Sequence, residues 1–118
     1  MSRNRLGKNK LENLIIQEIG SIYKRLLGHS LGSVYIQQFD SNLVIVLEGI
    51  VTSLERFLYE KRHYYLVDEL RSEIDNILST KVREIFEKSG KAQIIDFLSD
   101  SSVHTNVTGI VIIFKADF

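Results

Sequence analysis

The apolar positions of this chain follow a helical spacing, then a strand-like spacing, and then the same order again. Apolar side chains recur every three or four residues from 11 to 27, which predicts an amphipathic helix that ends before Gly28. Two runs rich in β-branched, aromatic and aliphatic residues follow, at 34–39 and 43–47. The short polar segment between them predicts a β-hairpin.

A second helical segment follows this hairpin. Thr52 and Glu55 have the spacing of a capping box, which predicts a helix start near Ser53. The apolar residues of its first turns, expected on its inner face, are Leu54, Phe57 and Leu58. Helical spacing continues to Phe86, but the polar run 60–63 leaves two alternatives. One is a single long helix that packs on a second subunit, and the other is a short helix followed by a long one.

Two further strands are predicted at 93–98 and 108–114. The polar segment 99–106 joins them and is longer than a tight hairpin requires. The last strand, like 43–47, carries aliphatic side chains on both faces, which is typical of a central strand with both faces covered.

The resulting order, α-β-β-α-β-β, is a cyclic rotation of the ferredoxin-like order and divides the chain into a pseudo-repeat, 11–50 and 54–118. We predict an α+β fold, a two-layer α/β sandwich in which a four-stranded, mainly antiparallel sheet carries its helices on one face. The length of 118 residues suits one domain, 11–118. A basic, flexible N-terminal arm is predicted at 1–10.

Helices on one face leave the other face of the sheet open, although both central strands are apolar on both sides. A second copy of the chain is the simplest cover for such a face. We therefore expect a homodimer through the open sheet face.

Charge and composition narrow the classes of partner. Fifteen basic side chains cancel fifteen acidic ones, so no nucleic acid is expected as a partner. The chain has no cysteine, which excludes disulfides and thiolate metal sites. No apolar run reaches the roughly 18 residues of a transmembrane helix, so no membrane span is expected and the predicted location is cytoplasmic.

The polar segment 99–108 is the best candidate for a site. It contains Ser99, Asp100 and His104, but serine–histidine–aspartate triads assemble from separate elements, so a polar hairpin loop is the favoured interpretation. No two histidines have the spacing of a metal site; the three are His29, His63 and His104.

Two carboxylates, Glu48 and Asp96, interrupt apolar strands. If they faced inward, burial would raise their pKa values towards the range of acid–base catalysis, whereas at a sheet end they would be structural. No glycine-rich phosphate loop is present. We assign no catalytic residue, no cofactor and no metal, and we predict a protein that is not an enzyme.

Two parts of the chain resemble the MpsC-like family. Residues 44–58, with a Leu-Glu-Gly run and a Thr-x-x-Glu pattern, are similar to the family's V-x-L-E-G-V-L-T-x-x-E-x-x-L stretch. Residues 95–100 and 109–114 resemble its closing V-x-x-F-x-S-D … x-x-V-F hairpin. The likeness extends over residues 11–114. These small bacterial proteins are named for a sodium-translocating, membrane-potential-generating system that is also connected with inorganic-carbon uptake.

The resemblance implies an accessory or regulatory protein that acts by protein–protein binding and is linked to a membrane ion or inorganic-carbon transport system. The alternative is a small-anion or nucleotide sensor that uses the helix start at Thr52 and the loop at Asp100. The candidate binding residues match family motifs or lie in the polar loop; they are Glu48, Gly49, Thr52, Glu55, Ser99, Asp100 and His104.

Overall fold

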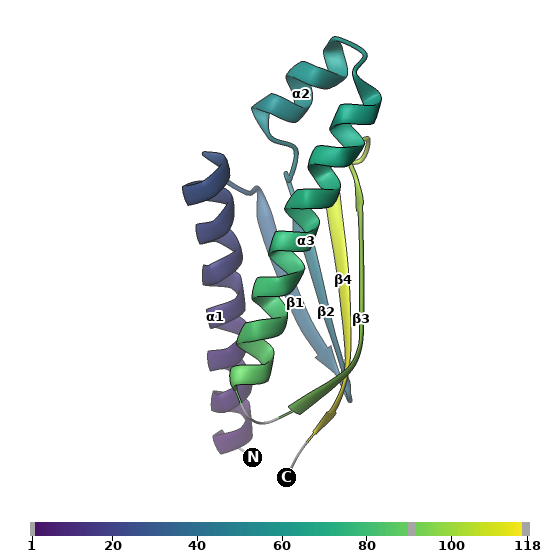
Figure 1. Cartoon of the computed structure of the whole chain (residues 1–118). Helices are drawn as coiled ribbons and strands as arrows, with labels where there is room; N and C mark the ends of the chain where they lie inside the picture. The colour runs from purple at the N-terminus through teal and green to yellow at the C-terminus, as the bar shows by residue number, and fades with distance from the viewer. Residues whose placement is uncertain (1, 90–91, 117–118) are drawn as a thin grey trace.

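The computed structural model of the chain describes residues 2–89 and 92–116, which form one α+β unit, as predicted (Figure 1). Its elements are, in chain order, α1 (Ser2–Leu27), β1 (Ser33–Phe39), β2 (Asn42–Glu48), α2 (Ser53–Glu60), α3 (Tyr64–Lys88), β3 (Ala92–Ser102) and β4 (Val107–Ala116). Helix α1 thus begins before the predicted start at Leu11 and includes residues of the predicted arm. The flexibility of that arm stays a prediction.

The four strands form one sheet in the order β1-β2-β4-β3, and every neighbouring pair is antiparallel. Ile45 of β2 pairs with Ile36 of β1 on one side and with Ile110 of β4 on the other. The two strands predicted to be central, because they are apolar on both faces, are therefore adjacent in the middle of the sheet.

Helices α1 and α3 both pack on one face of this sheet (Figure 1). The core between the layers contains fully buried residues of each: Ile19 and Tyr23 of α1, Leu78 of α3, Ile45 of β2 and Ile112 of β4. The helical spacing in the sequence anticipates these helix positions, because a helix that covers a sheet buries one stripe.

The second helical segment is broken, so the alternative of a short helix followed by a long one is confirmed. Arg62 has a left-handed φ of +63°, and α2 lies beyond the end of the sheet (Figure 1). The predicted inner face of α2 is wrong for Leu54 and Phe57, which are 55% and 54% exposed. Because the sheet does not extend beneath this turn, its buried residue is instead Glu55.

The connection between the last two strands is shorter than predicted. β3 continues to Ser102 and β4 begins at Val107, so the expected long polar connection 99–106 is wrong. Its serines belong to a strand because they pair across the hairpin: the Oγ of Ser101 lies 2.6 Å from Oγ1 of Thr108. Polar cross-strand pairs of this kind stabilise a sheet without apolar side chains.

The sheet face opposite the two long helices is open, with apolar residues in its middle rows and the acids Glu48, Asp96 and Asp100 nearer its ends and edge. Side chains alternate between the two faces along each strand, so the residues on either side of a buried residue point to this open face. The strand register aligns these residues in rows across the sheet. One row is Gln37, Val44, Val111 and Leu98, and the next is Tyr35, Val46, Gly109 and Asp100. Tyr35 and Leu98 are 56% and 51% exposed.

Candidate functional site

A buried guanidinium lies at the junction of three helices. Arg71 of α3 donates to both carboxylate oxygens of Glu55, at 2.8 Å from Nε and 2.5 Å from Nη2. It also donates to Oη of Tyr23 at 2.8 Å and to the backbone oxygen of Ile50 at 2.9 Å. A longer contact of 3.4 Å reaches Asp75 on the next turn. Arg71 therefore links α3 to α1, to α2 and to the segment after β2.

Glu55 is held in place by the predicted capping box. The backbone N–H of Glu55 donates to Oγ1 of Thr52 at 3.3 Å, and its Oε1 accepts from the backbone N–H of Thr52 at 3.0 Å. Arg71 thus meets a carboxylate that the local sequence has already positioned. The positive end of the α2 dipole is occupied by the helix's own carboxylate, which disfavours an added anion there.

Burial and the contacts of Arg71 act in opposite directions on the pKa values of this cluster. Burial acts to lower the pKa of Arg71, but the hydrogen bond to Glu55 and the interactions with Tyr23 outweigh it and raise that pKa. Burial raises the pKa of the Tyr23 hydroxyl, which Arg71 offsets only in part. Burial also raises the pKa of Asp75, against hydrogen bonds from Ser101 and Arg71. Near neutral pH, Arg71 is charged and Tyr23 is not.

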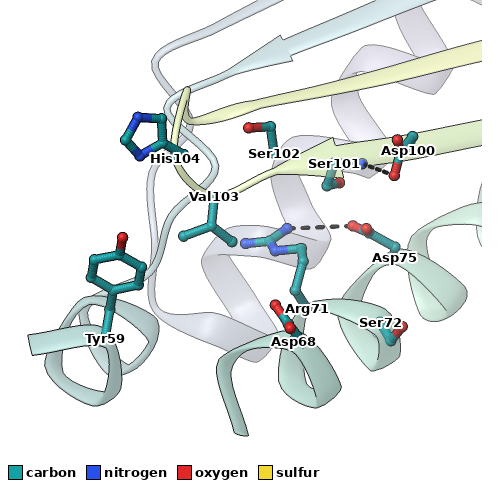
Figure 2. Close-up of a pocket in the computed structure, with 10 residues that line it drawn as sticks. All are labelled: Tyr59, Asp68, Arg71, Ser72, Asp75, Asp100, Ser101, Ser102, Val103 and His104. Carbon is teal, nitrogen blue, oxygen red and sulfur yellow. Dashed lines mark hydrogen bonds and ion pairs between the residues drawn. The ribbon is translucent and has the colours of Figure 1, made fainter. Parts of the chain in front are cut away.

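A polar pocket of about 360 Å³ lies between the first half of α3 and the β3–β4 hairpin, next to this cluster (Figure 2). The residues that line it include Asp68 and Asp75 of α3 and Asp100 of β3. Figure 2 shows Arg71 pointing towards Asp75 from the same helix, and His104 lying on the hairpin turn at the pocket's edge.

The Ser101 hydroxyl and the Asp100 carboxylate are hydrogen-bonded within the β3–β4 hairpin. The Oγ of Ser101 bonds Thr108 on the next strand, and Asp100 accepts from the backbone N–H of Ser101 at 3.0 Å. Among the described side chains, those of residues 10–89 and 93–115, no three Asp, Glu or His residues form a group that could hold a metal ion.

A second cluster ties three loops together at the same end of the sheet. Gly49 has a φ of +72°, its N–H donates to the backbone oxygen of Asn106 at 3.0 Å, and its oxygen accepts from Nε2 of His29 at 2.6 Å. A Cβ on Gly49 would lie 2.7 Å from the backbone nitrogen of Gly32. The side chain of Asn106 accepts from the backbone N–H of Val51 at 2.7 Å. Gly49 therefore has a structural explanation.

The structure brings together only some of the predicted site residues. Thr52 and Glu55 are buried beside Arg71, while Asp100 and His104 line the neighbouring pocket. Ser99 is exposed on β3 and does not line that pocket.

The hypothesis that two strand carboxylates face inward is wrong. Glu48 and Asp96 are both exposed, because the strand alternation puts them on the face away from the helices. Asp96 accepts from the backbone N–H of Phe97 at 2.9 Å. Neither carboxylate has the buried surroundings that acid–base catalysis would need.

Sequence reasoning missed the residue at the centre of the cluster. Arg71 stands four residues after Val67 and three before Ile74, so it occupies a position of the apolar stripe of α3. A charged residue in such a stripe is the available signal, since a buried charge requires a partner. That signal does not identify the partner, Glu55, which lies in the first turn of another helix.

The described residues include no helix that is long and apolar enough to cross a membrane. No curated protein and no solved structure matches the chain. A family model does match: MpsC, described as Na+-translocating membrane potential-generating system, over residues 7–116. That range covers the capping box, the buried arginine, the pocket and all four strands. The chain belongs to the MpsC family.

Proposed function

We propose that this protein is a non-enzymatic accessory or regulatory component of a membrane ion or inorganic-carbon transport system and acts by protein–protein binding. The family description supports the link to a sodium-translocating system at a membrane. The observation that carries the binding mode is the open, apolar face of the sheet, because soluble proteins rarely leave such a surface without a partner. The cytoplasm is the location that we propose for it.

A second copy of the chain is the proposed cover of this face. Its central row, Gln37, Val44, Val111 and Leu98, is uncharged, whereas Glu48, Asp96 and Asp100 lie in rows on either side, so the proposed contact is centred on the uncharged row. In the next row, Gly109 leaves the backbone of β4 open, with nothing within 4 Å of an added Cβ. A twofold interface uses the same patch on both subunits, and a flat apolar sheet face suits such self-complementary packing.

The transport system would then meet other surfaces of the dimer. β1 and β3 are the edge strands of the sheet, and each has one side without a strand neighbour among the described residues. Edge strands are common sites of binding by strand addition. The polar pocket beside Asp100 and His104 offers a second, hydrogen-bonding surface close to the β3 edge.

The proposal of a non-enzymatic role is supported by how the chain uses its own ionisable groups. Glu55 closes the cap of α2 and pairs with Arg71, and Arg71 in turn bonds Tyr23. Among the side chains that the structure describes, those of residues 10–89 and 93–115, every buried nitrogen and oxygen atom has a hydrogen-bond partner. Groups engaged in this way stabilise the fold and have little capacity left for a substrate.

The test is affinity purification of the tagged chain from its own cells, with membrane and soluble fractions analysed separately by quantitative mass spectrometry. Enrichment of subunits of an ion or inorganic-carbon transporter from detergent-solubilised membranes is the expected result. A tagged, unrelated protein of similar size serves as the control. Recovery of the chain alone from both fractions would contradict the accessory role.

A further inference from the structure

The corner between α2 and α3, residues 53–66, lies at one end of the molecule (Figure 1). It carries many exposed apolar side chains. Six of them are large and at least 45% exposed: Leu54, Phe57, Tyr59, Tyr64, Tyr65 and Leu66. Tyr65 is the most exposed, at 74%. Neither the buried arginine cluster nor the open sheet face accounts for this surface.

The same corner carries a local surplus of positive charge. Arg56, Lys61 and Arg62 are exposed there, against one exposed acid, Glu60, so the exposed charge is 3 − 1 = +2. The other acid of the corner, Glu55, is buried and neutralised by Arg71. The whole chain has a formal net charge of zero, so the positive surplus at the corner is local and is balanced by acids elsewhere in the chain.

The aromatic side chains of the corner are mixed with its basic ones. The Nζ of Lys61 lies 5.8 Å from the ring centroid of Phe57, and the rings of Tyr59 and Tyr64 meet edge to face with centroids 5.0 Å apart. Tyrosine is enriched where proteins meet the bilayer interface, since its ring is apolar and its hydroxyl reaches water. Lysine and arginine pair there with lipid phosphates.

We propose that the corner of residues 53–66 docks on the surface of an anionic lipid bilayer. Leu54, Phe57 and Tyr65 enter the headgroup region, and Arg56 and Lys61 contact lipid phosphates. Interfacial segments combine these two features, an apolar surface for the acyl boundary and basic residues for anionic lipid.

The shape of the corner favours a bilayer over a protein as the occupant. It projects beyond the sheet (Figure 1). Its exposed apolar residues belong to both helices. A fluid headgroup layer adapts to a projecting tip, whereas a protein partner would need a matching hollow. The next exposed acids along α3, Asp68 and Glu69, follow the corner and would stay outside the headgroup layer. This docking goes beyond the proposed function and requires neither the dimer nor the transport system.

The experiment is co-sedimentation of the purified full chain with phosphatidylglycerol vesicles and, separately, with phosphatidylcholine vesicles. Binding to the anionic vesicles that weakens with added salt is expected, with much weaker binding to the zwitterionic ones. The double variant Arg56→Glu/Lys61→Glu should lower the partition coefficient by about fivefold for each charge removed, and more for the reversal. Phe57→Ser/Tyr65→Ser should lower it on both kinds of vesicle.

The matched control reverses two exposed charges at the opposite end of the molecule, Lys88→Glu/Lys115→Glu. It changes the net charge by the same amount and leaves the basic N-terminal segment unchanged in all variants. Its binding should stay within about twofold of the parent chain, because surface electrostatic attraction decays within a Debye length. Circular dichroism confirms that each variant is folded.

The proposal is overturned if the parent chain does not sediment with phosphatidylglycerol vesicles at low salt. Equal losses in the corner variant and the Lys88/Lys115 control would also overturn it, because net charge alone would then explain the binding. So would corner variants that bind vesicles normally but lose a protein partner or the dimer, since the occupant would then be a protein.

Discussion

Arg71 of α3 holds both carboxylate oxygens of Glu55, a residue sixteen positions earlier in α2, and both side chains are buried. The pair fixes the short helix at the corner to the long one, and Tyr23 extends the link to α1. Such a pair contributes modestly to net stability, because desolvation offsets much of the attraction. Removing only one of the two side chains is costly, since the charge of the other stays buried without a partner.

Replacing Arg71 with methionine should lower the free energy of unfolding by about 3–5 kcal/mol, because the Glu55 carboxylate would be left buried without its partner. The double variant Glu55→Leu/Arg71→Met should lose less than Arg71→Met alone, since no unpaired charge remains. Urea denaturation, at a pH where the parent chain is two-state, measures both.

The exposed pair Lys81–Glu84, with atoms 4.0 Å apart, provides the control for this prediction. Lys81→Met should change the stability by less than about 0.5 kcal/mol, because exposed ion pairs contribute little. If Arg71→Met were as mild as Lys81→Met, the buried pair would not anchor the corner.

Alanine substitutions at two glycines with positive φ, Gly28 and Gly49, distinguish the cost of backbone strain from the cost of steric overlap. Gly28, at +61°, has open space around an added Cβ, so Gly28→Ala should cost only the left-handed conformation, about 1–2 kcal/mol. Gly49→Ala should cost more, because its Cβ would lie 2.7 Å from the backbone of Gly32. Thermal unfolding of the two variants side by side measures the difference. Equal losses would mean that the loops around Gly49 separate easily.

The raised pKa of Asp75 predicts a pH-dependent stability. The folded chain binds the Asp75 proton more tightly than the unfolded chain, so the contribution of this group is favourable at low pH and is lost as the pH rises through the raised pKa. Asp75→Asn should therefore be at least as stable as the parent chain at neutral pH, and any advantage should disappear towards about pH 4.

Urea titrations across this pH range test the Asp75 prediction. Asp68→Asn makes the same chemical change at an exposed position of the same helix and serves as the comparison. The prediction would be contradicted if Asp75→Asn were less stable than the parent chain at neutral pH but not at low pH. That result would mean that the charge of Asp75 stabilises the folded chain at neutral pH.

The closed cap of α2 predicts weak anion binding at its start. The carboxylate of Glu55 accepts a hydrogen bond from the backbone N–H of Thr52, so this donor is not available to an added anion. Nucleotides and bicarbonate should therefore not raise the melting temperature of the parent chain. A dye-based thermal-shift screen tests this. A clear, saturable rise that Thr52→Ala abolishes would favour the sensor alternative over the binding role.

Local patterns were sufficient to predict most of the fold. Three features depend only on residues that are near one another in sequence: the apolar stripe of α1, the capping box at Thr52, and the apolar residues on both faces of β2 and β4. The break before α3 was left open because the left-handed turn at Arg62 carries no glycine to mark it. The length of β3 was underestimated because serines such as Ser101 resemble a loop until their cross-strand partners are known.

The candidate site was predicted only where it is local. Thr52 and Glu55 follow from their own spacing, but the partner of Glu55 is sixteen residues away and on another helix. The prediction that Leu54 and Phe57 face inward failed for a related reason: a helical stripe predicts a buried face only if another layer lies beneath it. Neither tertiary relationship is encoded in a short window of sequence.

The central claim, that the open sheet face binds a second copy, can be probed at Gly109. This residue lies on that face with nothing within 4 Å of an added Cβ, and its φ is not in the left-handed region, so Gly109→Lys should leave the isolated fold intact. Gly20 of α1 also has nothing within 4 Å of an added Cβ, so Gly20→Lys is the matched control away from the sheet face.

The most direct measurement is the molar mass of the three proteins by light scattering after size-exclusion chromatography, over a range of concentrations. We predict about twice the chain mass of 13.6 kDa for the parent chain and for Gly20→Lys, and the single-chain mass for Gly109→Lys. A single-chain mass for the parent at every concentration, or a Gly109→Lys dimer as stable as the parent's, would contradict this prediction.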